Sequence, residues 1–178
     1  MSVSEQLSEA LSEGSGAGTV GPYGFDERAM KRTNKRAMKA YGELRNMGGA
    51  ESETGRLRRA HHGAGDPAAV ERELLPKAKE FADKKHRAAE QVRKSVRQMA
   101  SLIDPEKLPD KSKRHYDEFK DAVTQMDRFS KKGGPLPQSG GKQDASDTYY
   151  SANMNASMAV NALTALHGLL RSTDFRFY

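Results

Sequence analysis

Hydrophobic residues recur along the chain at the three- and four-residue spacing of an α-helix, and no stretch alternates as a β-strand would. Clusters of glycine and proline separate the helical stretches. The pattern predicts an all-α protein of long amphipathic helices joined by Gly/Pro-rich loops. It divides the chain into a flexible N-terminal arm with a short helix (1–25), a basic amphipathic helical region (26–130), a flexible linker (131–145) and an apolar C-terminal helix with an aromatic tail (146–178).

The helix expected from Asp26 to about Met47 has two different faces. Asp26 suits the N-cap position because its carboxylate can accept a hydrogen bond from the first turn, and Gly48 and Gly49 end the pattern. At about 100° per residue, an apolar stripe lies opposite a stripe of cations. The apolar stripe consists of Met30, Ala37, Tyr41 and Leu44, and the basic stripe of Arg28, Lys31, Arg32, Lys35, Arg36 and Lys39.

A second long helix is expected to follow a basic loop that contains Arg56, Arg58 and Arg59. Asp66 and Pro67 fit an N-cap and a first helical position, and Pro76 is expected to break or kink the helix before a run from Lys77 to Ile103. That run has an apolar stripe of Phe81, Ala88, Val92, Val96, Met99 and Ile103. Its opposite side is expected to carry Lys79, His86, Arg93 and Arg97.

A third helix is expected over 110–130, and the last helix, from about Ser146 to Arg171, differs from the others because its faces are nearly all small or apolar. A helix that is apolar all round must be buried, but its asparagine, serine and threonine residues argue against a membrane span. We expect it to pack between subunits. The predicted interface residues are Tyr149, Tyr150, Met154, Met158, Leu163, Leu166, Leu170, Phe175 and Phe177.

The composition favours a partner subunit and the binding of a polyanion. The chain has 178 residues, enough for one compact domain or for helices that complete their core against another subunit. Only 35% of its residues are hydrophobic and the mean hydropathy is −0.85, which favours a partner surface. Lys and Arg number 30 against 24 Asp and Glu, giving a net charge of +6 and a pI near 9.5, as expected for a polyanion binder.

No motif indicates catalysis. The absence of cysteine excludes a zinc–thiolate site and a thiol nucleophile. His61 and His62 lack a third ligand at helical spacing, and Gly14, Gly16 and Gly18 are neither preceded by a strand nor followed by the residues of a phosphate loop. We therefore expect neither an enzyme nor a metal, a cofactor or a small-molecule substrate, and no transmembrane segment.

The basic clusters favour nucleic acid as the partner because each neutralised phosphate releases condensed counterions, so that many modest contacts add up without base readout. Few aromatic residues accompany the cations, which favours the backbone of a double strand over stacking on single-stranded bases. The predicted contacts are Arg28, Lys31, Arg32, Lys35, Arg36, Lys39, Arg56, Arg58, Arg59, Lys79, Arg93 and Arg97.

Basic amphipathic helices, glycine-rich turns, an N-terminal arm and a small-residue apolar C-terminal helix together resemble the major coat proteins of filamentous archaeal double-stranded DNA viruses. The resemblance covers the layout of the whole chain and includes no short motif. It implies helical coat subunits that pair, with themselves or with a related second subunit, and wrap A-form DNA into a filament. It further implies a virion protein that is assembled in the host cytoplasm, with the cations of the two long helices facing the DNA.

Two other classes of protein share these features: a cellular chromatin or architectural DNA-binding protein, and a helical adaptor that binds an acidic protein. The residues alone leave open the choice between DNA and RNA, between a viral and a cellular origin, and between a homodimer and a pairing with a related subunit.

Overall fold

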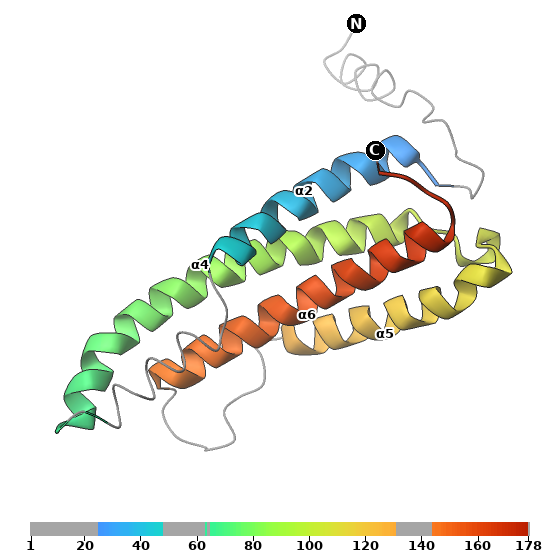
Figure 1. Cartoon of the computed structure of the whole chain (residues 1–178). Coiled ribbons are helices and arrows are strands. Elements are labelled where there is room, and N and C mark those ends of the chain that lie inside the picture. Colours follow the sequence, from blue (N-terminus) through green and yellow to red (C-terminus); the bar gives the residue numbers. More distant parts are fainter. Residues whose placement is uncertain (1–24, 48–62, 64, 131–143, 178) are drawn as a thin grey trace, which may run out of the picture.

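The computed structural model describes residues 25–47, 63, 65–130 and 144–177, and within these ranges it is built of helices without a strand. The all-α prediction is confirmed. Four long helices carry the fold (Figure 1), and two short 3₁₀ turns, Pro105–Lys107 and Asp110–Ser112, link the second to the third. The long helices are α2 (Glu27–Asn46), α4 (Pro67–Ser101), α5 (Lys113–Ser130) and α6 (Ala145–Ser172).

Aspartate caps begin three of these helices. The Asp26 carboxylate accepts a hydrogen bond from the Ala29 amide at 3.0 Å, and the Asp66 carboxylate accepts from Ala68 at 3.0 Å, so both predicted N-caps are confirmed. Helix α6 begins one residue before the predicted start, because Asp144 and Asp147 form a capping box.

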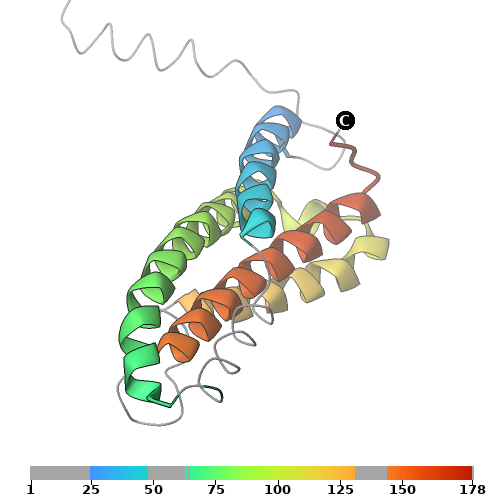
Figure 2. The same ribbon diagram turned by 60° about the vertical axis from the view of Figure 1, so that its left-hand side comes forward.

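Pro76 does not break the second helix, so of the expected break or kink the break is wrong. Helix α4 continues through Pro76 for 35 residues and curves along its length (Figure 2). A proline removes one backbone donor and crowds the carbonyl four residues earlier. Pro76 and Arg72 are both exposed, so water can satisfy the released carbonyl, while Ala78 and Ala82 pack on the core side. Packing therefore keeps the helix continuous.

Helix α6 lies at the centre of the bundle. It packs along α4 on one side and along α5 on the other, while α2 crosses over α4 and meets α6 near the C-terminal end of α6 (Figures 1 and 2). At that meeting point His167 Nε2 and Asn34 Oδ1 are 2.7 Å apart. Buried alanines let α6 approach its neighbours closely, and buried leucines fill the remaining volume. The alanines are Ala152, Ala156, Ala159 and Ala162.

The expectation that α6 packs mainly between subunits is corrected by this burial. Five predicted interface residues are already buried within the single chain: Tyr149, Leu163, Leu166, Leu170 and Phe175. Tyr150 is 53% exposed, and Met154, Met158 and Phe177 are half-buried. Small side chains at the helix contacts explain the difference, since they allow close packing with less apolar area than the average composition suggested. The single chain thus has its own core.

A second, smaller core lies at the end of the bundle where α4 begins. Ala78 of α4 packs with Ala145 and Tyr149 of α6, and Leu74, Leu75 and Phe81 surround them. The rings of Phe81 and Tyr149 are 4.9 Å apart between centroids. This cluster is separate from the main core and joins only the start of α4 to the start of α6.

Replacing Leu166 with Ala should lower the free energy of unfolding by about 2–5 kcal/mol, because Leu166 is fully buried in the main core. Replacing the exposed Thr164 of the same helix with Ala should change it by less than about 0.5 kcal/mol. Urea unfolding of both variants over a hundredfold range of protein concentration tests this. A midpoint that rises with concentration would contradict a core private to one chain.

Candidate nucleic-acid interface

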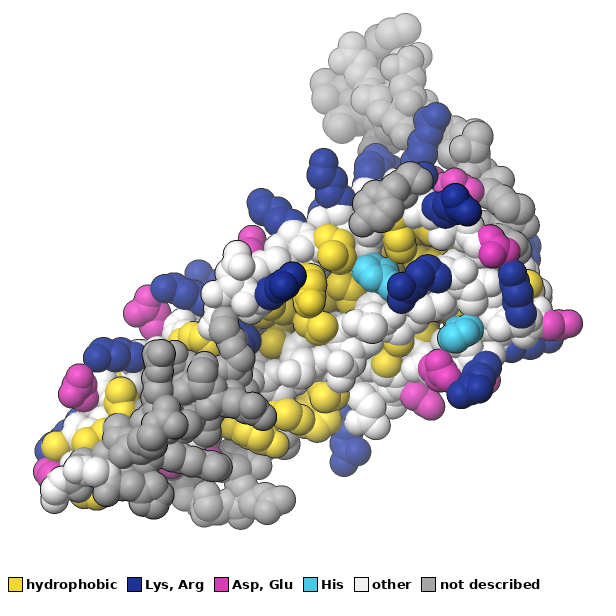
Figure 3. Space-filling view, in the orientation of Figure 1, with side chains coloured by type: hydrophobic (Ala, Val, Ile, Leu, Met, Phe, Trp, Pro, Cys, Tyr) yellow, Lys and Arg dark blue, Asp and Glu magenta, His cyan; other side chains and the backbone are white. Residues whose placement is uncertain are grey.

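The outer face of α2 carries the most concentrated positive charge on the described surface. All six predicted cations of this helix are exposed, and they fall within an arc of about 140° over a length of about 16 Å. Dark blue side chains project along the upper edge of the molecule, where α2 lies (Figure 3). The opposite side of α2 packs on the core through Met30, Ala37 and Leu44, as the sequence predicted.

Within the described part of the chain, no carboxylate neutralises the cations of this face. No ion pair between described residues involves Arg28, Lys31, Arg32, Lys35, Arg36 or Lys39. The ammonium of Lys31 lies 5.9 Å from the centre of the Phe175 ring. Glu27 and Glu43 are the only acids within the helix, and they stand at its two ends. The middle of the face is uniformly basic.

Cations on α4 and α5 are arranged differently, because many of them pair with acids one helical turn away. Lys84 lies 2.6 Å from Glu80, and Lys77 lies 3.2 Å from Glu73. The hydrogen bond from Lys84 lowers the pKa of Glu80. Such exposed pairs contribute little to stability, but they cancel charge locally. Among the described helices, α2 therefore carries the longest row of cations that have no acidic partner in the described part of the chain.

The predicted contacts outside α2 have mixed outcomes. Lys79 is exposed on α4, and Arg97 is exposed but pairs with Asp127 of α5. The expected outward position of Arg93 is wrong: its side chain is only 4% exposed, because α6 covers a wider arc of α4 than the apolar stripe indicated. Arg56, Arg58 and Arg59 lie outside the described residues, as do His61 and His62.

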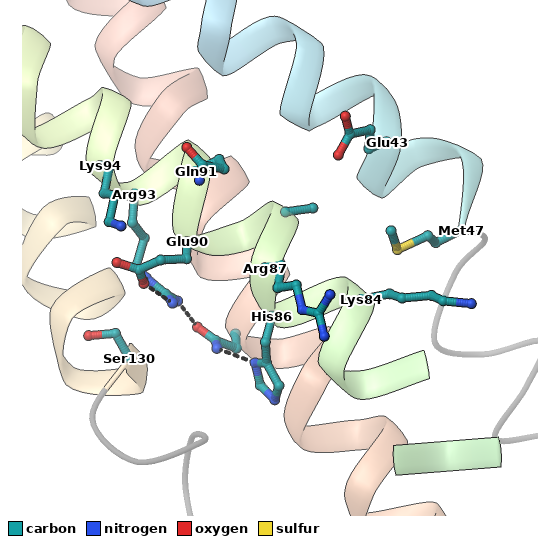
Figure 4. A pocket seen from close by; sticks show the side chains of 12 residues that line it. Glu43, Met47, Lys84, His86, Arg87, Glu90, Gln91, Arg93, Lys94 and Ser130 are labelled. Atoms are coloured by element: carbon teal, nitrogen blue, oxygen red, sulfur yellow. Dashed lines mark hydrogen bonds and ion pairs between the residues drawn. The ribbon is translucent and has the colours of Figure 1, made fainter. Parts of the chain in front are cut away.

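Arg93 belongs to a polar network that the sequence analysis missed. Its guanidinium donates to Asn155 Oδ1 of α6 and, at 2.9 Å, to Glu90. The Asn155 amide in turn donates to His86 Nδ1 at 2.7 Å. Figure 4 shows this chain of contacts beside an open groove. The signal was present in the sequence, since asparagines on an apolar helix need buried partners, but only the packing of α6 on α4 identifies those partners.

This network positions α4 relative to α6. Burial, followed by the nearby Arg93 charge, lowers the pKa of His86, while Asp83 acts in the opposite direction. Burial also lowers the pKa of His167, helped by Arg171. Both imidazoles are therefore favoured in the neutral form, in which His86 can accept the Asn155 hydrogen bond. The arrangement joins α4 to α6 through charge and hydrogen bonds.

The described part of the chain holds neither a metal-binding cluster nor a membrane-spanning helix. Its His, Asp and Glu residues form no group of three that could hold a metal ion. None of its helices is both long and apolar enough to cross a membrane. The chain matches no family model, and no curated protein or solved structure matches it.

The two histidines with lowered pKa should make stability depend on pH. The unfolded chain binds protons near the ordinary value of 6.5, whereas the folded chain resists protonation. The free energy of unfolding should therefore be constant above about pH 6.5 and fall as the pH drops toward the lowered folded-state values. Urea unfolding at pH values from about 5 to about 8, which bracket the ordinary histidine pKa, would measure this dependence on pH.

A double variant, His86→Gln with His167→Gln, should lose most of that dependence. His115→Gln is the matched control, since His115 lies on the surface of α5 beside Glu118. If the double variant kept the full dependence on pH, other groups would be responsible.

Proposed function

We propose that this protein binds the backbone of double-stranded nucleic acid through the outer face of α2, without sequence specificity and without catalysis. One observation carries the proposal: six exposed cations lie on one face of one helix, and no described carboxylate pairs with them. Phosphates are the counterions that such a row fits best, because each contact releases condensed cations from the nucleic acid.

The shape of the face also suits a duplex backbone. A straight row about 16 Å long runs beside about five phosphates of one strand, which succeed one another every 3.4 Å or so along the axis. The face presents flexible lysine and arginine side chains and no aromatic ring, so it favours charge contacts over base stacking. Its helical backbone holds the charges in a fixed order, which supports repeated binding of a regular polyanion.

We further propose that the binding serves packaging, as in a coat protein that covers viral DNA within a helical filament. The support is the layout of the chain, with its basic helices and its apolar helix. Subunits would then meet through surfaces other than the buried core of α6, and exposed Tyr150 with half-buried Met154 and Met158 provides apolar area for this. Such a protein would be assembled in the host cytoplasm and reside in the virion.

A cellular architectural DNA-binding protein is the second candidate, and a specific observation favours it. The core of α6 is complete within one chain, so the fold does not require a second subunit for its burial. Such a protein would coat DNA as single molecules or small clusters.

Replacing Lys35, Arg36 and Lys39 together with Gln should weaken duplex binding and reduce its dependence on salt. Each phosphate contact contributes about 0.9 to the slope of log K against log salt, so the slope should fall by about 3. Fluorescence anisotropy with a short labelled duplex at several salt concentrations measures both effects.

The matched control replaces Lys77, Lys84 and Lys120 with Gln, which removes the same charge from cations that pair with acids on α4 and α5. This triple variant should keep most of the slope. Equal losses in the two variants would show that net charge alone governs binding, and would contradict an interface on α2.

Negative-stain imaging should separate the two candidates. A coat protein mixed with long duplex at saturating ratio should form filaments of uniform width, whereas an architectural protein should leave bare DNA between discrete particles. Replacing Tyr150 with Ser should then reduce filament length without changing the affinity for a short duplex, because Tyr150 lies near the start of α6, whereas α2 meets α6 near its C-terminal end. Discrete particles at full saturation would contradict the coat function while leaving the α2 interface in place.

A further inference from the structure

A small pocket lies between the C-terminal half of α2 and the middle of α6. Its volume is about 260 Å³. Hydrophobic side chains gather at the surface between these two helices (Figure 3). The described residues that line the pocket are Tyr41, Leu44, Arg45, Lys85, Asn153, Ala156, Ser157, Val160 and Asn161. This lining combines an apolar wall with two cations, and it includes no acidic residue.

Two of the lining residues are polar and buried. Lys85 is 5% exposed and Asn153 is 4% exposed. The Lys85 ammonium donates to Asn153 Oδ1 and lies 5.0 Å from the centre of the Phe81 ring. Because Oδ1 accepts from an ammonium group, the other amide atom of Asn153 must be the NH₂ donor. That nitrogen is buried and has no hydrogen-bond partner among the described residues.

We propose that this pocket binds a carboxylate carried on a short apolar chain. A buried donor without an acceptor is costly, and an acceptor placed in the pocket would remove that cost. An anionic acceptor fits best, because Lys85 stands beside the amide and Arg45 stands among the other lining residues. Leu44, Ala156 and Val160 would cover the aliphatic part of the ligand.

The burial of Lys85 supports the same assignment. Removal from water lowers the pKa of Lys85. A carboxylate bound next to the Asn153 amide would favour the ammonium form. The lysine and the ligand would then hold each other in the charged state.

The pocket is independent of the nucleic-acid interface. It opens on the flank of α2 that faces α6, whereas the row of α2 cations points away from the core. The inference therefore goes beyond the proposed function, and a test without nucleic acid can fail or succeed separately.

Titration of the full-length protein with sodium hexanoate tests the proposal, with 1-hexanol as the uncharged probe of equal length. Hexanoate should bind with a dissociation constant on the order of a millimolar, and hexanol at least tenfold more weakly. In ¹⁵N spectra hexanoate should move the side-chain amide resonances of Asn153, and hexanol should leave them in place. Equal binding of both probes, or unchanged Asn153 resonances, would overturn the proposal.

A matched pair of variants locates the site. Asn153→Asp replaces the buried donor with an acid that Lys85 can still pair with, and it should weaken hexanoate binding by at least about tenfold. Asn161→Asp adds the same charge at an exposed lining position and should weaken binding far less. Similar losses in both variants would overturn the buried site. Should Asn153→Asp fail to fold, the wild-type amide shifts alone decide.

The carboxylate could come from a free small molecule or from a glutamate side chain of a bound peptide. A third probe, N-acetylglutamate amide, distinguishes the two sources. Tighter binding of hexanoate assigns the pocket to small aliphatic acids, and tighter binding of the glutamate derivative assigns it to a peptide.

Discussion

The structure depends on the need to cover a helix that is apolar on nearly every side. Helix α6 carries buried leucines and alanines on every side but one, and exposing them to water would cost far more than one chain of low average hydropathy can offset elsewhere. Helices α4 and α5 enclose it, and α2 completes the cover over α4 and the end of α6. The alanines make this possible because they bring helix axes close together, so few large side chains are needed.

The packing that covers α6 also determines which helix surface can carry a row of cations without acidic neighbours. Helix α4 contacts the core along a broad arc, and the outer surfaces of α4 and α5 alternate acids with bases one turn apart. Helix α2 sits at the edge of the bundle and contacts the core along a narrow stripe, so its outer arc is free for a row of cations. The cations of that row repel one another, and solvent screening reduces this repulsion at the surface.

The sequence predicted the fold class, two of the three aspartate caps and the two faces of α2, because these depend on local chemistry and on the helical period. The sequence-based prediction failed at positions whose burial depends on a neighbouring helix. The pattern of a single helix placed Arg93 in solvent and made no assignment for Lys85. Both side chains point inward in the structure, where Arg93 donates to Asn155 and Lys85 donates to Asn153 of α6. The same is true of Leu166, whose burial within one chain depends on the close packing that alanines permit. Pro76 shows that tertiary packing overrides a local helix-breaking preference.

The division of the apolar interior into two clusters has a consequence for motion. The first turns of α4 and α6 are joined by a small core around Ala78, Ala145 and Tyr149, while the rest of the bundle shares the large one. Losing the small cluster exposes little apolar area, so this end can open while the remainder stays folded. Amide hydrogens there will exchange by local fraying at rates unrelated to global unfolding, and a protease will find its first cleavage sites at this end of the described helices.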